Sequence, residues 1–494
     1  MKMKLNQVAF AVVLAFPLLA SAQSNAELQS QIQELKAQLA QLKAMITQNA
    51  SAPAAAPVAQ GEQLPPVDPE EFNQVKVKVD SMIDQQSTAG FKGLRISGGF
   101  DPVYMVNRSK GTSSFAFLNN FASTNGVATS IVPGGIGSGE IYSYDNSYFG
   151  MAYLDIQKEM DDGGTKFRLT LAPSKSAGSG FNFGSIVHEA SASIPLTDSQ
   201  TRLMIGQMPD VSGYEPYFNT FVGANSLTSN LLYPGYAEYF ITKNMLFDFT
   251  AATAYTGVGL DLTRGPWETK LILANFNSAR NDCPVTPVGA GASTCGTDPT
   301  RSPTFIYNVT YAQDEFWGFE FTGYEGSVTN WVHGGTSRLS QFEIDGNYTR
   351  GNFNGNLQFT TGRQADAGLN DNGDAQWWGV SALVAQRVTS QLTLAARADY
   401  LNNDKNGGGN FGGGFADGIN GFGAGDPNAP GYDANVGANR YSLSLAATYR
   451  LTTNVALRAE YRHDHSTLPT FFYYGDQTYR SNNDTFGLQA IVNF

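Results

Sequence analysis

The stretch that decides the fold class is TFGLQAIVNF, residues 485–494. Its apolar side chains stand at every second position: Phe486, Leu488, Ala490, Val492 and Phe494. Successive side chains of an extended strand point to opposite faces, so this alternation predicts a strand with one apolar face. Its length matches the roughly 9 to 11 residues that a tilted strand needs to cross a bilayer.

The same alternation recurs from Lys92 onward, for example in residues 166–173, 353–361 and 441–450. Each of these segments has one apolar and one polar face, as strands of a transmembrane barrel do. We expect sixteen such strands. They span residues 93–107, 147–158, 165–173, 184–195, 201–209, 251–262, 267–276, 304–312, 316–325, 340–350, 353–362, 377–388, 392–401, 440–450, 455–463 and 484–494.

The connections between these segments alternate between short turns and long polar or Gly-rich loops. This asymmetry is typical of bacterial outer-membrane barrels, which have short periplasmic turns and longer external loops. A soluble β-sandwich also alternates, but its loops would not sort by length. The short turns are expected at residues 161–164, 264–266, 313–315, 351–352, 389–391 and 451–454.

The composition agrees with a membrane barrel and excludes other classes. Only 15% of the 494 residues are charged, and 53 are Gly. Beyond the N-terminus we find no run of about 18 or more apolar residues, so a helical membrane protein is excluded and a closed barrel remains. The net charge of −12, without a basic stripe, argues against nucleic-acid binding.

The N-terminal part predicts export and a helical segment. Residues 1–22 have the basic start, apolar stretch and A-x-A end of a signal peptide, so the mature chain would begin near Gln23. A short a/d seam predicts a coiled coil over residues 23–50; an amphipathic helix lying on the chain's own surface is the alternative. An Ala/Pro-rich linker (51–70) and a short helix (71–90) would lead to the barrel domain, residues 91–494.

Two cysteines, Cys283 and Cys295, lie in one Pro/Gly-rich stretch. In an exported chain we expect them to form a local disulfide, since their spacing fits neither C-x-x-C nor a zinc site. We expect no cofactor and no bound metal: His463 and His465 are more simply solvated, and neither glycine run (134–139 and 407–418) precedes a helical pattern.

The final aromatic residue, Phe494, resembles the C-terminal assembly signal of outer-membrane barrel proteins. From Lys92 to Phe494 the chain resembles the 16-stranded trimeric porins, and with its N-terminal coiled coil it is similar to the DcaP-like porins and to uncharacterised proteobacterial porins. The resemblance implies a homotrimer among outer-membrane lipid and lipopolysaccharide, a coiled coil in the periplasm, and insertion by the barrel assembly machinery.

In porins the loop after the fifth strand folds into the barrel and narrows it. Residues 210–250 hold that position here, so the resemblance makes Asp210 and Glu215 candidate constriction acids. An external loop that packs on itself or on a neighbouring subunit is the alternative.

Charged residues in lumen register would form the facing wall. A basic arc opposite an acidic arc would orient dipolar solutes and filter them by charge, and the arginines favour an anionic or zwitterionic solute. Alternatively, the arginines pair with Asp399 and Glu460. The basic residues are Arg397, Arg450, Arg458, Arg462, Lys166, Arg168 and Arg202; the acidic ones are Glu320, Glu343 and Asp345.

The sequence therefore predicts an outer-membrane channel for passive diffusion of small hydrophilic solutes. A structural tether or adhesin anchored by the barrel is the alternative. We do not expect an enzyme, because a hydrolase needs a base beside its nucleophile and the chain has four histidines, of which only His188 is expected inside a strand and not at a strand end or in a loop.

Overall fold

The computed structural model describes residues 93–109, 111–117, 150–160, 163–172, 187–215, 239–251, 254–276, 303–314, 316–329, 336–367, 373–403, 430, 437–473 and 475–494. The chain divides into two units, residues 1–81 and 82–494, and every described residue belongs to the second. The predicted signal peptide, coiled coil, linker and short helix, and both cysteines, lie outside the described residues.

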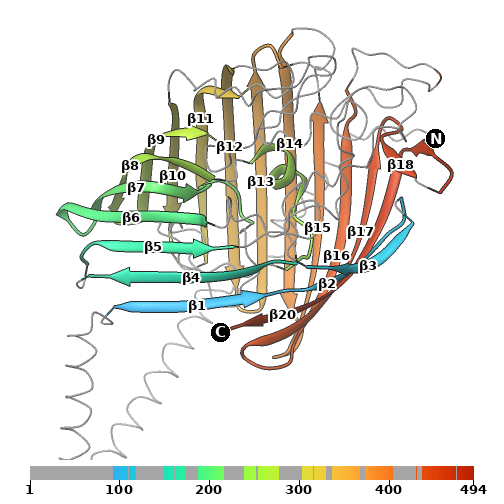
Figure 1. The fold of residues 1–494 in the computed structure, drawn as a ribbon, viewed down its shortest axis with the longest axis horizontal. Helices are drawn as coiled ribbons and strands as arrows, with labels where there is room; N and C mark the ends of the chain where they lie inside the picture. The colour runs from blue at the N-terminus through green and yellow to red at the C-terminus, as the bar shows by residue number, and fades with distance from the viewer. Residues whose placement is uncertain are drawn as a thin grey trace, which may run out of the picture. The chain divides into compact units, whose positions relative to one another are not determined.

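The described part of the chain forms a closed antiparallel barrel of sixteen strands (Figure 1). Its first strand is made of β1 (Leu94–Phe100) and β2 (Val103–Asn107), and both halves pair with the last strand to close the ring. The other fifteen are β4 (Ala152–Glu159), β5 (Lys166–Leu171), β6 (Val187–Asp198), β7 (Thr201–Pro209), β8 (Ala254–Arg264), β9 (Trp267–Phe276), β10 (Thr304–Ala312), β11 (Trp317–Thr329), β12 (Thr336–Arg350), β13 (Phe353–Gln364), β14 (Ala375–Arg387), β15 (Leu392–Asn403), β16 (Arg440–Arg450), β17 (Val455–Ser466) and β20 (Asn482–Asn493).

Closure depends on the alternating segment at the C-terminus. Strand β20 pairs with β17 on one side and with β1 and β2 on the other. The backbone of Phe494 also exchanges two hydrogen bonds with Gly98, at 2.9 and 3.0 Å. A closed barrel leaves no unpaired strand edge, which is the condition for placing a sheet in lipid.

The first strand is less regular than the predicted continuous segment 93–107. It is interrupted at Asp101-Pro102, where proline lacks the N–H that a ladder needs. There the neighbour changes from β4 to β3 (Thr112–Ala116), a short strand that the sequence analysis missed. The hairpin of β18 (Phe471–Tyr473) and β19 (Thr478–Arg480) was also missed.

The two faces of the barrel differ as the alternation predicts. Leu443, Leu445 and Leu457 point outward and are about half exposed, whereas Ser442 and Ser444 point inward and are buried. Outward aromatics gather near strand ends, as in the contacts of Trp267 with Tyr311 and of Trp378 with Tyr400. An apolar outer band flanked by aromatic side chains is the surface that a membrane barrel presents to lipid. No helix in the described ranges is long and apolar enough to span a membrane.

Candidate functional site

The connection between β7 and β8 enters the barrel. Its described parts, residues 210–215 and 239–251, contact the inward faces of β10 to β17. Within it, residues 240–244 belong to no helix or strand and bend at 241–242, and the short helix α4 (Met245–Thr250) follows. We call residues 239–251 the inner segment. It lies where the sequence analysis places the constriction.

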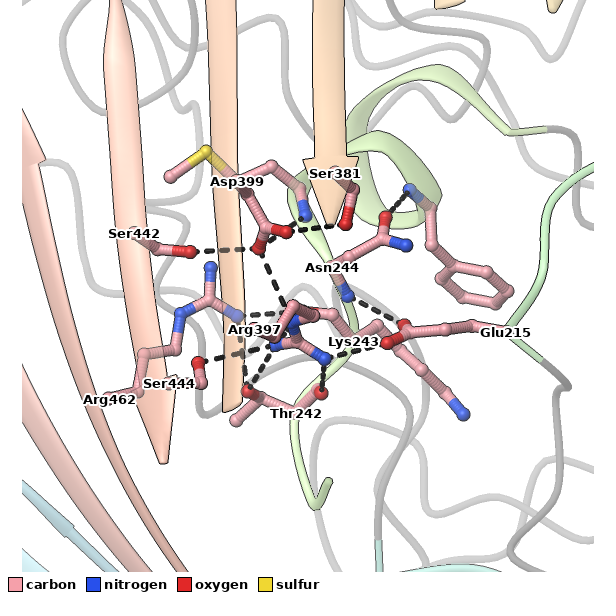
Figure 2. Close-up of polar contacts among 12 residues, drawn as sticks. Glu215, Thr242, Lys243, Asn244, Ser381, Arg397, Asp399, Ser442, Ser444 and Arg462 are labelled. Carbon is pink, nitrogen blue, oxygen red and sulfur yellow. Dashed lines mark hydrogen bonds and ion pairs between the residues drawn. The ribbon is translucent and has the colours of Figure 1, made fainter. Parts of the chain in front are cut away.

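Arg397 of β15 is the main anchor of the inner segment (Figure 2). Its Nη1 atom donates to Glu215 Oε1 at 2.6 Å and to the Thr242 carbonyl at 2.8 Å, and Nη2 donates to the Lys243 carbonyl at 3.0 Å. Its Nε atom lies 3.4 Å from Asp399. The guanidinium group is fully buried, so its N–H groups bind the backbone of the inner segment and the carboxylates of Glu215 and Asp399 in place of water.

Strand β17 supplies three further anchors. Arg458 donates to the Phe240 carbonyl at 2.9 Å, and Arg462 donates to the Lys243 carbonyl at 2.7 Å. Glu460 accepts from the backbone N–H groups of residues 241 and 242, and from the Thr242 hydroxyl at 2.5 Å. Wall side chains thus satisfy buried backbone groups of residues 240–243, which belong to no helix or strand.

Helix α4 begins at a local cap and packs on the wall. Asn244 Oδ1 accepts from the N–H of Phe247 at 2.6 Å, a standard N-cap, and its amide donates to Gln358 of β13 at 3.1 Å. Leu246 approaches Gly379 of β14 so closely that a Cβ there would lie 2.3 Å from it.

Apolar side chains of α4 extend the inner segment across the lumen. They form one cluster with Leu401 of β15, with residues that flank β4 and β5, and with the β18–β19 hairpin, so the helix links strands that are not neighbours in the barrel. The cluster contains Met151, Ala172, Met245, Leu246, Phe247, Phe249, Leu401, Phe471 and Tyr473.

The two predicted constriction acids occupy different surroundings. Glu215 is buried, bonded to Arg397 and to the backbone N–H of Asn244 at 2.6 Å. Burial raises the pKa of its carboxyl group against the opposing effect of Arg397. Asp210, just beyond β7, accepts from the Tyr324 hydroxyl at 2.5 Å and from Ser212 at 2.8 Å. Burial by its neighbours raises the pKa of Asp210 to about 7.

The other predicted basic residues do not join the Arg397 cluster. Arg168 binds Asp155 at 2.7 Å on the inward faces of β4 and β5, and Arg202 binds backbone carbonyls near the 163–165 turn. Lys166 lies 3.7 Å from Glu159. Arg450 lines a cavity of about 130 Å³ at the short-turn end of the barrel, together with Tyr239 and Arg387.

The predicted acids Glu320, Glu343 and Asp345 lie together on the inward faces of β11 and β12, fully buried. Among the histidines of the described strands, His188, His463 and His465 stand in outward register, and His463 bonds Asp484 at 2.8 Å.

Sequence reasoning gave Glu460 only as an arginine partner and missed its role in binding the inner segment. It also missed Thr242 and Lys243, which act through backbone carbonyl groups. A carbonyl group leaves no signal in sequence, whereas the inward register of Glu460 on β17 is readable from the alternation.

Comparison with known proteins gives a family and distant structural likenesses. Residues 68–494 match the model of the family described as "Protein of unknown function (DUF3138)". No curated protein matches the chain.

Among solved structures, the chain is similar to outer-membrane porins at low TM-scores. These include the anion-selective porin from Comamonas acidovorans (10% identity, 81% of this chain and 99% of that one, TM-score 0.47) and the trimer form of OmpT from Vibrio cholerae (10%, 81% and 99%, 0.46). Pseudomonas putida OprB is a third (8%, 84% and 97%, 0.45). The barrel assignment therefore rests on the strand pairing of this chain, and the match over residues 68–494 makes the chain a member of the DUF3138 family.

Proposed function

We propose that the barrel is a water-filled outer-membrane channel for passive diffusion of small hydrophilic solutes, narrowed by the inner segment. The outward faces are apolar and suit lipid, while the inward faces carry the polar and charged side chains. A sixteen-stranded barrel is wide enough to leave an aqueous channel unless part of the chain fills it.

The observation that carries this proposal is the attachment of the inner segment to the inward wall. Its backbone is bound by Arg397 of β15 and by Arg458, Glu460 and Arg462 of β17. These attachment points span the wall from β15 to β17. A segment held at that many points keeps its position while solute passes beside it. The width of the opening between the inner segment and the rest of the wall would then set the largest solute that passes.

The charges at this attachment balance. Five buried basic residues lie with five buried acidic residues: Arg397, Arg440, Arg458, Arg462 and Lys243, and Glu215, Asp248, Asp399, Glu460 and Asp464. The arginines are therefore engaged with carbonyl and carboxylate groups, and we propose weak charge selection that favours neutral or zwitterionic solutes over the anions that the arginine wall first suggested.

The proposal includes the assembly expected from the sequence. The barrel would be a homotrimer among outer-membrane lipid and lipopolysaccharide, inserted by the barrel assembly machinery that reads Phe494. The coiled coil would stand in the periplasm, and Cys283 and Cys295 would close a disulfide.

Swelling of liposomes tests the channel directly. Vesicles containing the folded full-length protein should swell in isotonic solutions of small sugars, and the rate should fall steeply with sugar size. Vesicles with heat-unfolded protein are the control. Folded, inserted barrels that admit not even the smallest sugar would refute the proposal.

A further inference from the structure

Three carboxylates meet on the inward wall away from the inner segment's anchors. Glu320 of β11 and Asp345 of β12 are direct cross-strand partners, and Glu343 lies two residues before Asp345 on the same face. One oxygen atom from each lies within 4.8 Å of the others, and all three side chains are fully buried. Within the described ranges no other three acidic, histidine or cysteine side chains converge in this way.

This arrangement is electrostatically costly unless something positive lies between the carboxylates. Like charges placed directly opposite each other in a sheet are destabilising, and more so when they are buried. Among the described residues, no donor group of the wall bonds either carboxylate oxygen of Asp345 or Glu343 Oε1. The hydrogen-bonding neighbours of Asp345 are the two other acids, Glu320 and Glu343, and such contacts between acids require a shared proton. Thr360 donates to the other oxygen of Glu343 at 2.6 Å. Asp345 is therefore a buried acid aimed at two others, with no neutral or basic donor of the described wall to satisfy its oxygens.

Among the described residues, the charged groups around the cluster do not cancel its excess negative charge. Lys270 of β9 interacts favourably with Glu320, but its ammonium group forms an ion pair with Glu268 at 2.7 Å. Asp210 faces the same region from the start of the loop and supplies no positive charge. Neutral oxygen donors are close by: Gln358 is the cross-strand partner of Asp345, and Thr360 that of Glu343.

We propose that Glu320, Glu343 and Asp345 bind one hard divalent cation, of the Ca²⁺ class. Carboxylate, hydroxyl and amide oxygens are the ligands that Ca²⁺ prefers, and its six to eight ligands at flexible angles suit side chains fixed by strand register. The cluster lacks the imidazole and thiolate ligands that favour zinc or copper. The cation would stabilise the wall beneath Gly213, whose Cβ position would lie 3.8 Å from Glu343 Oε1.

Calorimetry on lipopolysaccharide-free protein tests the site. Full-length protein refolded in detergent and washed with chelator would be titrated with CaCl₂, and in parallel with MgCl₂. We expect about one Ca²⁺ per chain and a higher apparent melting temperature with Ca²⁺ than with EDTA. Asp345→Asn should weaken binding by roughly tenfold or more. Asp261→Asn, which removes an inward acid outside the cluster, should bind as the wild type does.

Three results would overturn the proposal. The first is that neither Ca²⁺ nor Mg²⁺ binds to the wild type. The second is that Asp345→Asn binds as tightly as the wild type, and the third is that Asp261→Asn loses as much affinity as Asp345→Asn. If Asp345→Asn does not fold, Glu343→Gln takes its place with the same expectation. A wild type insensitive to cation but stabilised by Asp345→Asn in EDTA would show that the acids share protons instead. Binding is measured without reference to conductance, so the test stands apart from the channel proposal.

Discussion

The inward side chain of Arg397 shows how one residue can hold a loop in position inside the barrel. Its guanidinium group is buried, contacts two acids and two carbonyl groups, and lies 4.5 Å from the centre of the Phe240 ring. Removing one partner of such a pair leaves an uncompensated buried charge, which costs about 3–5 kcal/mol. The same arginine would be a solute ligand if its donors faced open water, so contacts rather than residue type decide its role.

Asp210 gives a pH dependence with a definite sign. Its pKa of about 7 in the folded protein lies above the ordinary 3.8, so the folded state binds more protons than the unfolded state between these values. The contribution of Asp210 to the free energy of unfolding is greatest below about pH 4 and decreases as the pH rises to about 7. Above that pH it does not change further. Because the side chain is only partly buried, we expect a change of roughly 1–3 kcal/mol.

The Asp210→Asn variant checks this assignment, because an amide cannot titrate and still accepts from Tyr324. The difference in apparent melting temperature between pH 4 and pH 8 should be smaller for Asp210→Asn than for the wild type. The variant should also be the more stable of the two at pH 8. Identical pH profiles would show that Asp210 does not titrate in this range.

At the scale of elements, the barrel strands and the position of the loop after the fifth strand were readable, and the helix within that loop was not. Alternating side chains predicted all sixteen strands, with ends that differ by a few residues, as in β6 at Val187–Asp198 against an expected 184–195. The six-residue helix α4 has no period long enough to detect, and all its residues are buried by distant strands. The acid cluster was predicted in part: the alternation places Glu320, Glu343 and Asp345 on the inward face, but the register that sets Glu320 directly opposite Asp345 is not readable from sequence.

Strand β16 allows a matched test of the two faces. Leu445 points outward near the middle of the strand, and Thr448 lies on the inward face beside the short-turn cavity. A lysine facing lipid near mid-bilayer costs about 2–4 kcal/mol, so Leu445→Lys should lower stability in vesicles by about that amount. Thr448→Lys should lower it much less. Equal losses measured by urea unfolding would contradict the assignment of faces.

At the scale of the whole molecule, we propose an open channel that is narrowed by the inner segment, which Arg397 holds against the wall. Removing the anchor should loosen the inner segment without opening the strand ladder, because Arg397 bonds the segment through its side chain while β15 stays paired on both sides. The channel should then widen or fluctuate more. The exposed Arg338 of β12 provides a matched control, since Arg338→Gln removes the same charge far from these contacts.

Single-channel recording in planar lipid bilayers tests this claim most directly. Folded wild-type protein should produce uniform current steps, Arg338→Gln should reproduce them, and Arg397→Gln, with its barrel fold verified by circular dichroism, should give larger or noisier steps. An absence of steps from folded wild type would contradict the channel. Steps of the same size and noise from Arg397→Gln would contradict the role of the inner segment as the narrowing element.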